Sequence, residues 1–178
     1  MMFSNKIKIS FLLSISFIFF FISFNNSKSQ EIVNLVGIAE VVDGDTIRID
    51  KKKIRLFGID APEKKQLCKK NYLSIFIFSF SKNYNCGQIS SDKLKKFLNN
   101  HIITCEFKKQ KDQYKRYLGI CFKKNKDINA WLVRSGYALS YRKYSKKYLN
   151  EEFHAKKNKL GIWNGSFEMP WDWRKKNK

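Results

Sequence analysis

Hydrophobic and polar residues alternate along the first part of the chain in the way that is typical of β-strands. Residues 35–42 (LVGIAEVV) and 45–50 (DTIRID) form two such runs, and the Asp-Gly pair between them is a strong turn signal. A third run, 54–60 (IRLFGID), ends at an Ala-Pro pair, where the proline has no N–H to offer a neighbouring strand. The pattern therefore predicts a hairpin followed by a third strand.

The middle and the end of the chain alternate between helical and strand spacing. Residues 87–100 (GQISSDKLKKFLNN) place their apolar residues on one face, which predicts a helix. HIITCEF (101–107) and RYLGICF (116–122) follow as two further strands around a lysine-rich turn. INAWLVRSG (128–136) predicts a second helix, stopped by its glycine, and residues 145–160 predict a third, charged helix.

Five short strands with about three helices between and after them indicate a mainly β, α+β fold. This combination fits a small five-stranded Greek-key barrel. An open α+β sheet is the alternative. The tail EMPWDW (168–173) is expected to pack its two tryptophans back on the body.

The stretch YLSIFIFSF (72–80) does not fit this pattern, because it is apolar, β-prone and uncharged. One interpretation is a strand or hairpin that packs on the body and is held by a disulfide. The other is an exposed loop that contacts a membrane or a partner protein. The sequence leaves both interpretations open.

The N-terminal segment has the order of an export signal. Two lysines precede an apolar run at residues 9–24, and small residues follow around Ser29. We expect residues 1–29 to be a signal peptide, or else an N-terminal anchor that contacts the membrane through residues 9–24. Residues 30–178 then form one domain that is periplasmic or secreted, or that is anchored facing outside the cytoplasm.

The four cysteines agree with an exported protein. Their number is even and no CxxC spacing suggests zinc, so a disulfide framework is expected. Three pairings are possible. Cys105 and Cys121 lie symmetrically about Gln113, as cross-strand partners in a hairpin would, which leaves Cys68 with Cys86. Free buried thiols are the alternative.

The charge of the chain is strongly unbalanced. Thirty-six Lys and Arg residues face 15 Asp and Glu residues, a formal net charge of +21 over 178 residues. A charge of this size favours association with polyanions such as nucleic acid or an anionic membrane, and carries no information on the fold. A lysine-rich solvated surface without a partner is the alternative.

Against this basic background, four carboxylates gather around two predicted strand ends. They are Asp43, Asp45, Asp60 and Glu63. If the strands are neighbours, the carboxylates meet at one rim, where their mutual repulsion would raise their pKa values. A divalent cation removes this repulsion, and an all-oxygen set without a nearby His or Cys suits calcium or magnesium.

Five separated motifs resemble the thermonuclease, or staphylococcal-nuclease-like, family. They are DGDT (43–46), RLFGIDAPE (55–63), YKRYLG (114–119), LVRSGYA (132–138) and LGIW (160–163), in the family order. The likeness extends from about residue 35 to Trp163. It is specific, because five motifs at compatible spacing are a far stronger signal than one short pattern. Together with the export signal, it is the pattern of an exported bacterial member.

The resemblance implies an OB-fold barrel and calcium-dependent hydrolysis of DNA and RNA. It assigns the metal to the carboxylates of Asp45 and Asp60 and to the backbone carbonyl of Ala61. Asp43 is expected beside the metal, through water. Alanine replaces a family threonine at position 61, a change that leaves a main-chain ligand intact.

The resemblance also assigns the catalytic side chains. Arg55 and Arg116 match the family arginines that neutralise the phosphate, and their bidentate guanidinium groups suit that task better than lysine. Glu63 matches the glutamate that activates or orients the attacking water. Lys115 and Tyr117 flank Arg116 where many relatives have glycine, so the turn that directs Arg116 is expected to differ.

Three tyrosines, Tyr114, Tyr141 and Tyr144, are candidates for contacting the nucleotide through hydroxyl groups or stacking. The sequence thus predicts a monomeric, calcium-dependent endonuclease or exonuclease with DNA and RNA as partners. A non-catalytic nucleic-acid-binding OB-fold module is the main alternative. A basic protein that binds a membrane surface is a second one, although it leaves the acidic rim without a role.

Overall fold

The computed structural model describes residues 31–75 and 78–177, and a compact unit begins at Ile32. The predicted signal peptide or anchor at residues 1–29 lies outside the described residues. Within the described part of the chain, no helix combines the length and the apolar character needed to cross a membrane.

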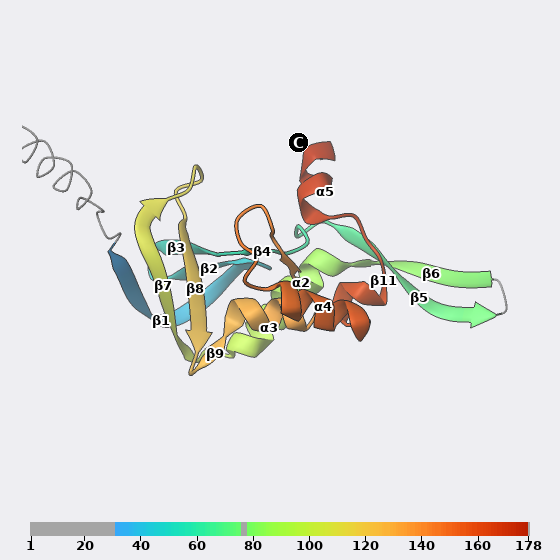
Figure 1. Ribbon diagram of the computed structural model, residues 1–178, viewed down its shortest axis with the longest axis horizontal. Coiled ribbons are helices and arrows are strands. Elements are labelled where there is room, and N and C mark those ends of the chain that lie inside the picture. The colour runs from blue at the N-terminus through green and yellow to red at the C-terminus, as the bar shows by residue number, and fades with distance from the viewer. Residues whose placement is uncertain (1–30, 76–77, 178) are drawn as a thin grey trace, which may run out of the picture. The chain divides into compact units, whose positions relative to one another are not determined.

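Five strands close into a barrel (Figure 1). β1 (Ile32–Asp43), β2 (Thr46–Ile49) and β3 (Lys52–Leu56) form an antiparallel meander. β7 (Ile102–Lys111) pairs with β1, and β8 (Tyr117–Lys123) pairs with β7. A parallel pairing between β3 and β8 closes the sheet. The predicted barrel is confirmed, with the OB-type order that the resemblance implies, and the open-sheet alternative is wrong.

The predicted third strand, 54–60, is not continuous. β3 ends before Gly58, whose φ of +78° is accessible to glycine at little cost. The chain then leaves the barrel and forms β4 (Ile59–Asp60), which pairs with β10 (Leu139–Ser140). This break brings Asp60 to the rim of the barrel.

The described residues contain four α-helices instead of about three. They are α2 (Cys86–Leu98), α3 (Ile128–Arg134), α4 (Leu149–Lys157) and α5 (Pro170–Lys176), with a 3-10 turn, η1 (Gly161–Asn164), between the last two. The helix predicted at 145–160 is shorter, since α4 begins at Leu149 and ends at Lys157. The tail that was expected only to pack on the body contains α5. Short β9 (Lys126–Asp127) follows β8.

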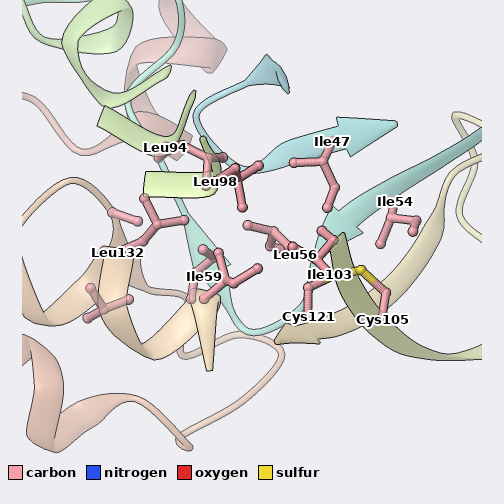
Figure 2. Packing of buried hydrophobic residues seen from close by; sticks show 14 of the residues in the cluster. Ile47, Ile54, Leu56, Ile59, Leu94, Leu98, Ile103, Cys105, Cys121 and Leu132 are labelled. Carbon is pink, nitrogen blue, oxygen red and sulfur yellow. A yellow bond between two sulfur atoms is a disulfide. The ribbon is translucent and has the colours of Figure 1, made fainter. Parts of the chain in front are cut away.

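Aliphatic side chains from the strands fill the barrel and meet those of the helices (Figure 2). Ile47, Ile54 and Leu56 come from β2 and β3, and Leu94 comes from α2. Each is fully buried, which stabilises the fold by about 1.5–3 kcal/mol per side chain. The Cys105–Cys121 disulfide joins directly opposed residues of β7 and β8 within this core, one of the two pairings that the sequence favours.

The apolar stretch at 72–80 lies in a hairpin. β5 (Leu67–Ile75) pairs with β6 (Phe78–Asn85), and the hairpin extends away from the barrel (Figure 1). β11 (Gly165–Ser166) pairs with its base, and the Cys68–Cys86 disulfide joins that base to the first residue of α2. The stretch is therefore part of a hairpin held by a disulfide at its base, and whether its apolar side chains contact the body, a membrane or a partner stays a prediction.

Candidate active site

A cleft of ≈ 800 Å³ lies at the rim of the barrel, beside the β1–β2 turn and the break after β3. Acidic, basic and aromatic side chains line it together. They include Asp43, Asp45, Arg55, Glu63, Asp112, Tyr114, Arg116, Tyr141, Lys143, Tyr144, Trp171, Arg174 and Lys175. All three predicted catalytic residues and all three predicted nucleotide-contacting tyrosines therefore line one cleft.

The Arg55 guanidinium joins the two carboxylates that were predicted as metal ligands. Its Nη1 forms a close ion pair with Asp45 Oδ1, and its Nη2 donates to Asp60 Oδ1 at 2.6 Å. Because one guanidinium contacts both, Asp45 and Asp60 converge on the same place. Asp60 is fully buried below the cleft surface, and the side chain of Arg55 is 14% exposed.

The fold places Asp45 by pairing β2 with β3. Thr46 lies opposite Arg55 in the antiparallel register, and the main chain of Asp45 accepts a hydrogen bond from the Leu56 N–H at 2.8 Å. The Asp45 carboxylate accepts from Thr46 Oγ1 and from the Ala61 N–H, both at 3.1 Å. Burial would raise the pKa of Asp45, but the Arg55 charge and these hydrogen bonds outweigh it and lower the pKa.

At Asp43 the effects that raise the pKa outweigh those that lower it, the opposite of Asp45. Burial and the neighbouring charge of Asp45 raise its pKa to about 6, although the Gly44 N–H donates to its Oδ1 at 2.7 Å. Ser91 Oγ from α2 is 3.4 Å from the same oxygen. The rim therefore carries more carboxylate than its arginines neutralise at this point.

Arg116 is held in place by an acidic residue that the sequence did not single out. Asp112 Oδ2 accepts from the Arg116 guanidinium at 2.8 and 2.9 Å, and Asp112 Oδ1 accepts from the Arg116 N–H at 2.9 Å. Lys115, which precedes Arg116, adopts a left-handed φ of +60°. Arg116 Nη1 also lies 3.4 Å from Thr46 Oγ1, which connects it to Asp45.

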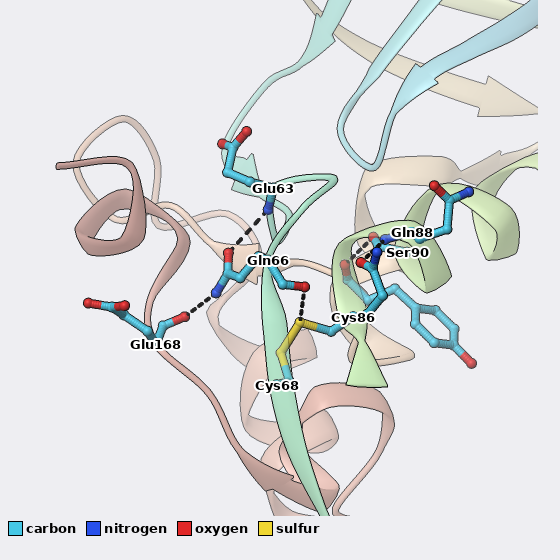
Figure 3. Close-up of a disulfide and its surroundings, with 9 residues drawn as sticks. Glu63, Gln66, Cys68, Cys86, Gln88, Ser90 and Glu168 are labelled. Atoms are coloured by element: carbon cyan, nitrogen blue, oxygen red, sulfur yellow. Dashed lines mark hydrogen bonds between the residues drawn. A yellow bond between two sulfur atoms is a disulfide. The ribbon is translucent and has the colours of Figure 1, made fainter. Parts of the chain in front are cut away.

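Glu63 lies in a loop that is held at its main chain (Figure 3) and at its side chain. Its N–H donates to Gln66 Oε1 at 3.1 Å, and Gln66 Nε2 donates to the carbonyl of Glu168 in the tail at 2.6 Å. Its Oε1 accepts from Arg174 Nη1 at 2.6 Å. The loop also packs against α2, where a Cβ on Gly87 would lie 1.7 Å from the Glu63 carbonyl oxygen, so only glycine fits.

Aromatic rings form one wall of the cleft. Tyr141 and Trp171 stack with ring centroids 5.4 Å apart and planes at 11°, and Tyr144 meets Tyr141 edge-on at 5.0 Å. Tyr114 is 65% exposed and lies under the Arg116 guanidinium, 5.1 Å from ring centroid to Cζ. Trp171 therefore packs on the body as predicted for the tail, and it does so against Tyr141, one of the predicted nucleotide-contacting residues.

Sequence reasoning missed Arg174, Trp171 and Asp112. Arg174 contacts Asp60 with both terminal nitrogens, at 2.8 and 3.1 Å, as well as Glu63. Within α5, Trp171 and Arg174 are three positions apart and share one helix face. What the sequence could not show is that this short helix lies against the rim of the barrel.

The residues present suit a hard divalent cation. Asp45 and Asp60 converge, and the main chain of Ala61 lies beside the Asp45 carboxylate. The Ala61 contact is its N–H, which donates to Asp45 Oδ2, so the oxygen ligands that the structure shows here are the two carboxylates, the kind that calcium and magnesium prefer. Among the described residues, no three His, Cys, Asp or Glu side chains form a metal-holding group. An ion here would therefore take the remaining oxygens from water or substrate, as open sites do.

Comparison with known proteins agrees with this geometry. The family described as "Staphylococcal nuclease homologue" matches residues 53–165. The chain is 36% identical over 137 residues to the succinoglycan biosynthesis protein ExoI of Rhizobium meliloti, covering 75% of this chain and 67% of that protein. It is 32% identical over 147 residues to an uncharacterized endonuclease of Escherichia coli, covering 77% and 82%. It is 28% identical over 155 residues to endonuclease YncB of Bacillus subtilis, covering 79% and 67%. With its barrel, its motifs and these relatives, the chain belongs to the staphylococcal nuclease homologue family.

Proposed function

We propose that the protein is a calcium-dependent nuclease that hydrolyses phosphodiester bonds of DNA and RNA. The observation that carries this proposal is that Asp45, Arg55, Glu63 and Arg116 line one cleft, with Asp60 buried beneath it and bonded to Arg55. The endonucleases among the relatives support the same reaction. The net charge of +21 supports a polyanionic substrate.

The chain's own residues supply the chemistry that a phosphodiester needs. The attacked phosphate gains negative charge in the transition state, and Arg55 and Arg116 at the cleft wall would neutralise part of it. Each such preorganised donor contributes about 3–4 kcal/mol in comparable sites. Calcium held by Asp45, Asp60 and the Ala61 carbonyl, with Asp43 beside it, would supply further positive charge at the phosphate.

Glu63 is the base in this proposal. A water oxygen forms the new bond to phosphorus and its proton passes to the Glu63 carboxylate. The ester P–O bond breaks, and the leaving oxygen keeps the bonding electron pair and takes a proton from solvent water. One oxygen of Glu63 is bonded to Arg174, and the side chain is 28% exposed to the cleft. Tyr114, Tyr141 and Tyr144 would contact the flanking nucleotide by stacking or through their hydroxyl groups.

Cleavage of plasmid DNA and of RNA, measured with calcium and then with a chelator, tests this function. The purified protein should degrade both substrates in calcium and neither in chelator. Degradation that continues in chelator would reject the metal assignment. Binding without cleavage in calcium would reject the enzyme and favour a non-catalytic binding module.

A matched pair of substitutions separates Glu63 from a general loss of charge. Glu63→Gln keeps the size of the side chain and removes the proton acceptor, so kcat should fall by about 100–10,000-fold. Glu40→Gln on β1 removes an equal charge from an exposed ion pair with Arg48 and should leave kcat unchanged. Equal activity of the two variants would remove Glu63 from the mechanism.

We further propose that the protein works as a monomer outside the cytoplasm. Two disulfides, Cys68–Cys86 and Cys105–Cys121, support an oxidising compartment. Fractionation of cells that express the full chain should place the activity in the periplasm or medium, or on the outer face of a membrane if residues 9–24 are retained. Recovery of the active protein in the cytoplasm with free thiols would contradict this proposal.

A further inference from the structure

We infer that Arg174, on the C-terminal helix α5, is a positioning residue of the active site that holds Glu63 and Asp60 in a fixed relation. This inference rests on the proposed function, because it assigns the tail a part in the same reaction. It makes the active site incomplete without the C-terminal helix, although the five family motifs end at Trp163.

The geometry of the guanidinium carries the inference. Arg174 Nη1 donates to Glu63 Oε1 at 2.6 Å and to Asp60 Oδ1 at 3.1 Å, and Nη2 donates to Asp60 Oδ2 at 2.8 Å. A planar fork that bonds one carboxylate with both arms fixes its own orientation. The third bond therefore fixes Glu63 relative to Asp60, and lysine cannot reproduce this arrangement.

Burial makes these contacts stronger than an exposed ion pair. Asp60 has no exposed side-chain surface, and the side chains of Glu63 and Arg174 are 28% and 33% exposed. Arg55 already donates to Asp60 Oδ1, so Arg174 brings a second positive charge to a buried carboxylate. An arginine without a role in the site would not be expected to contact a fully buried carboxylate.

The rest of the tail fastens the same loop and directs the arginine. The Glu168 carbonyl accepts from Gln66 Nε2 at 2.6 Å, and Gln66 Oε1 accepts from the Glu63 N–H at 3.1 Å (Figure 3). Trp171, on the same face of α5 as Arg174, stacks on Tyr141 of the cleft wall. The tail thus contacts the Glu63 loop at its main chain and at its side chain.

This arrangement has a definite catalytic consequence. Arg174 occupies one oxygen of Glu63, so the carboxylate cannot rotate freely away from the cleft. A base that must accept a proton from a bound water gains most from such restriction, since misplacement of about 1 Å costs large factors in rate. Loss of a hydrogen-bond partner that orients an active-site carboxylate in this way typically lowers activity by about 10–100-fold.

Arg174→Gln in the full-length protein tests the inference, with Lys176→Gln as the matched control. Lys176 lies on the same helix, carries the same charge and pairs with Glu168 instead of the rim. Arg174→Gln should lower kcat by about 10–100-fold and leave KM within about threefold. Arg174→Lys should restore part of the loss, and added guanidinium should raise the activity of Arg174→Ala. Lys176→Gln should behave like the wild type.

Two measurements do not depend on activity. Amide hydrogen exchange in residues 63–66 should be faster in Arg174→Gln than in Lys176→Gln or the wild type. Calcium binding, followed by titration calorimetry, should change by less than about threefold, because Asp60 keeps its hydrogen bond from Arg55. Unchanged exchange together with unchanged kcat would overturn the inference.

Other outcomes identify what would be wrong. Tighter calcium binding and higher activity of Arg174→Gln would mean that Arg174 competes with the ion, and would overturn a positioning role. If Arg174→Gln lowered kcat, calcium affinity and thermal stability together, Arg174 would be a residue that supports the fold and not one that positions Glu63. A wild-type protein that cleaves nothing in calcium would refute the proposed function itself, whereas a fully active Arg174→Gln enzyme would refute only this inference.

Discussion

Arg55 lies between two carboxylates, and this position makes the shape of its guanidinium as important as its charge. Its two terminal nitrogens contact Asp45 and Asp60 separately. Arg55→Lys retains one positive charge but can contact only one carboxylate at a time with comparable geometry. We therefore expect kcat to fall by about 100–1,000-fold while the protein still folds, as measured by steady-state cleavage and circular dichroism.

The matched control is Arg48→Lys on β2, whose partner is the exposed Glu40. An exposed ion pair contributes about 0–1 kcal/mol, so this change should leave both rate and fold unaltered. If Arg55→Lys kept nearly full activity, Arg55 would have no part in neutralising the phosphate. Its role would then be the ion pairs alone.

Asp112 makes the stability of the Arg116 turn depend on pH. Burial raises the pKa of Asp112, but hydrogen bonds from Arg116 and Tyr114 and the Arg116 charge outweigh it, so the folded-state pKa is lowered. The ionised carboxylate therefore stabilises the fold above the unfolded pKa of about 4, and this contribution is lost as the pH falls through the folded value. Asp112→Asn should cost about 1 kcal/mol in the free energy of unfolding at pH 7 and progressively less toward pH 3.

Urea unfolding of both proteins across this pH range measures the difference. Asp50→Asn, in the exposed turn between β2 and β3, is the control. Its difference from the wild type in the free energy of unfolding should not shrink between pH 7 and pH 3. A cost for Asp112→Asn that is the same at pH 7 and pH 3 would show that hydrogen bonding, and not ionisation, stabilises the turn.

At the scale of single residues, the sequence indicated those side chains that belong to short local motifs. Asp45, Arg55 and Glu63 are close in sequence or in register on paired strands, so their convergence follows from a hairpin and one further strand. Arg174 is 111 residues from Glu63, and only the packing of the tail brings the two together. Asp112 has a local role, but an aspartate in a polar turn is a common feature and gives no distinct signal.

One of the two disulfides lies beside the active-site loop, and the other lies inside the barrel. Cys68–Cys86 spans 18 residues and joins β5 to α2 beside the Glu63 loop, whereas Cys105–Cys121 spans 16 residues inside the barrel. Because the loops have nearly equal length, replacing either pair with alanine should cost about 3 kcal/mol in the free energy of unfolding. Only the loss of Cys68–Cys86 is expected to lower kcat as well, by about tenfold, because the disulfide holds Gly87 of α2 close to the main chain of Glu63.

Urea unfolding and steady-state cleavage of the two double variants check this expectation, and the barrel pair is the control. Equal effects of both variants on kcat would mean that the base of the β5–β6 hairpin does not support the active site. A change in stability without any change in kcat would lead to the same conclusion.

Elements were predictable where hydrophobic periodicity was regular, and were altered where the tertiary structure required it. The β1–β2 turn and helix α2 lie where the pattern places them. The third strand breaks at Gly58 because β4 pairs with β10, a contact between segments about 80 residues apart that no local pattern contains. α5 is short and is stabilised by its contacts with the rim, so its sequence alone does not predict a helix.

On the scale of the whole molecule, the net charge of +21 can act as a diffuse field or through the lysines at the cleft. The two possibilities differ in how strongly particular charges control substrate binding. Lys143 and Lys175 line the cleft, while Lys124 and Lys126 are exposed residues of the β8–β9 hairpin that do not line it. A lysine that neutralises a phosphate releases bound counterions, so its removal weakens the dependence of binding on salt.

Replacement of both cleft lysines by glutamine should therefore reduce the slope of log KM against log salt concentration. On single-stranded DNA the reduction should be about 0.7 for each phosphate that the variant no longer neutralises. The double Lys124→Gln and Lys126→Gln variant has the same reduction in charge and should keep the wild-type slope. KM measured between about 50 and 200 mM salt on one oligonucleotide gives all three slopes. Equal reductions in the two variants would mean that the diffuse field attracts the substrate, and the cleft lysines would then have no special interaction with it.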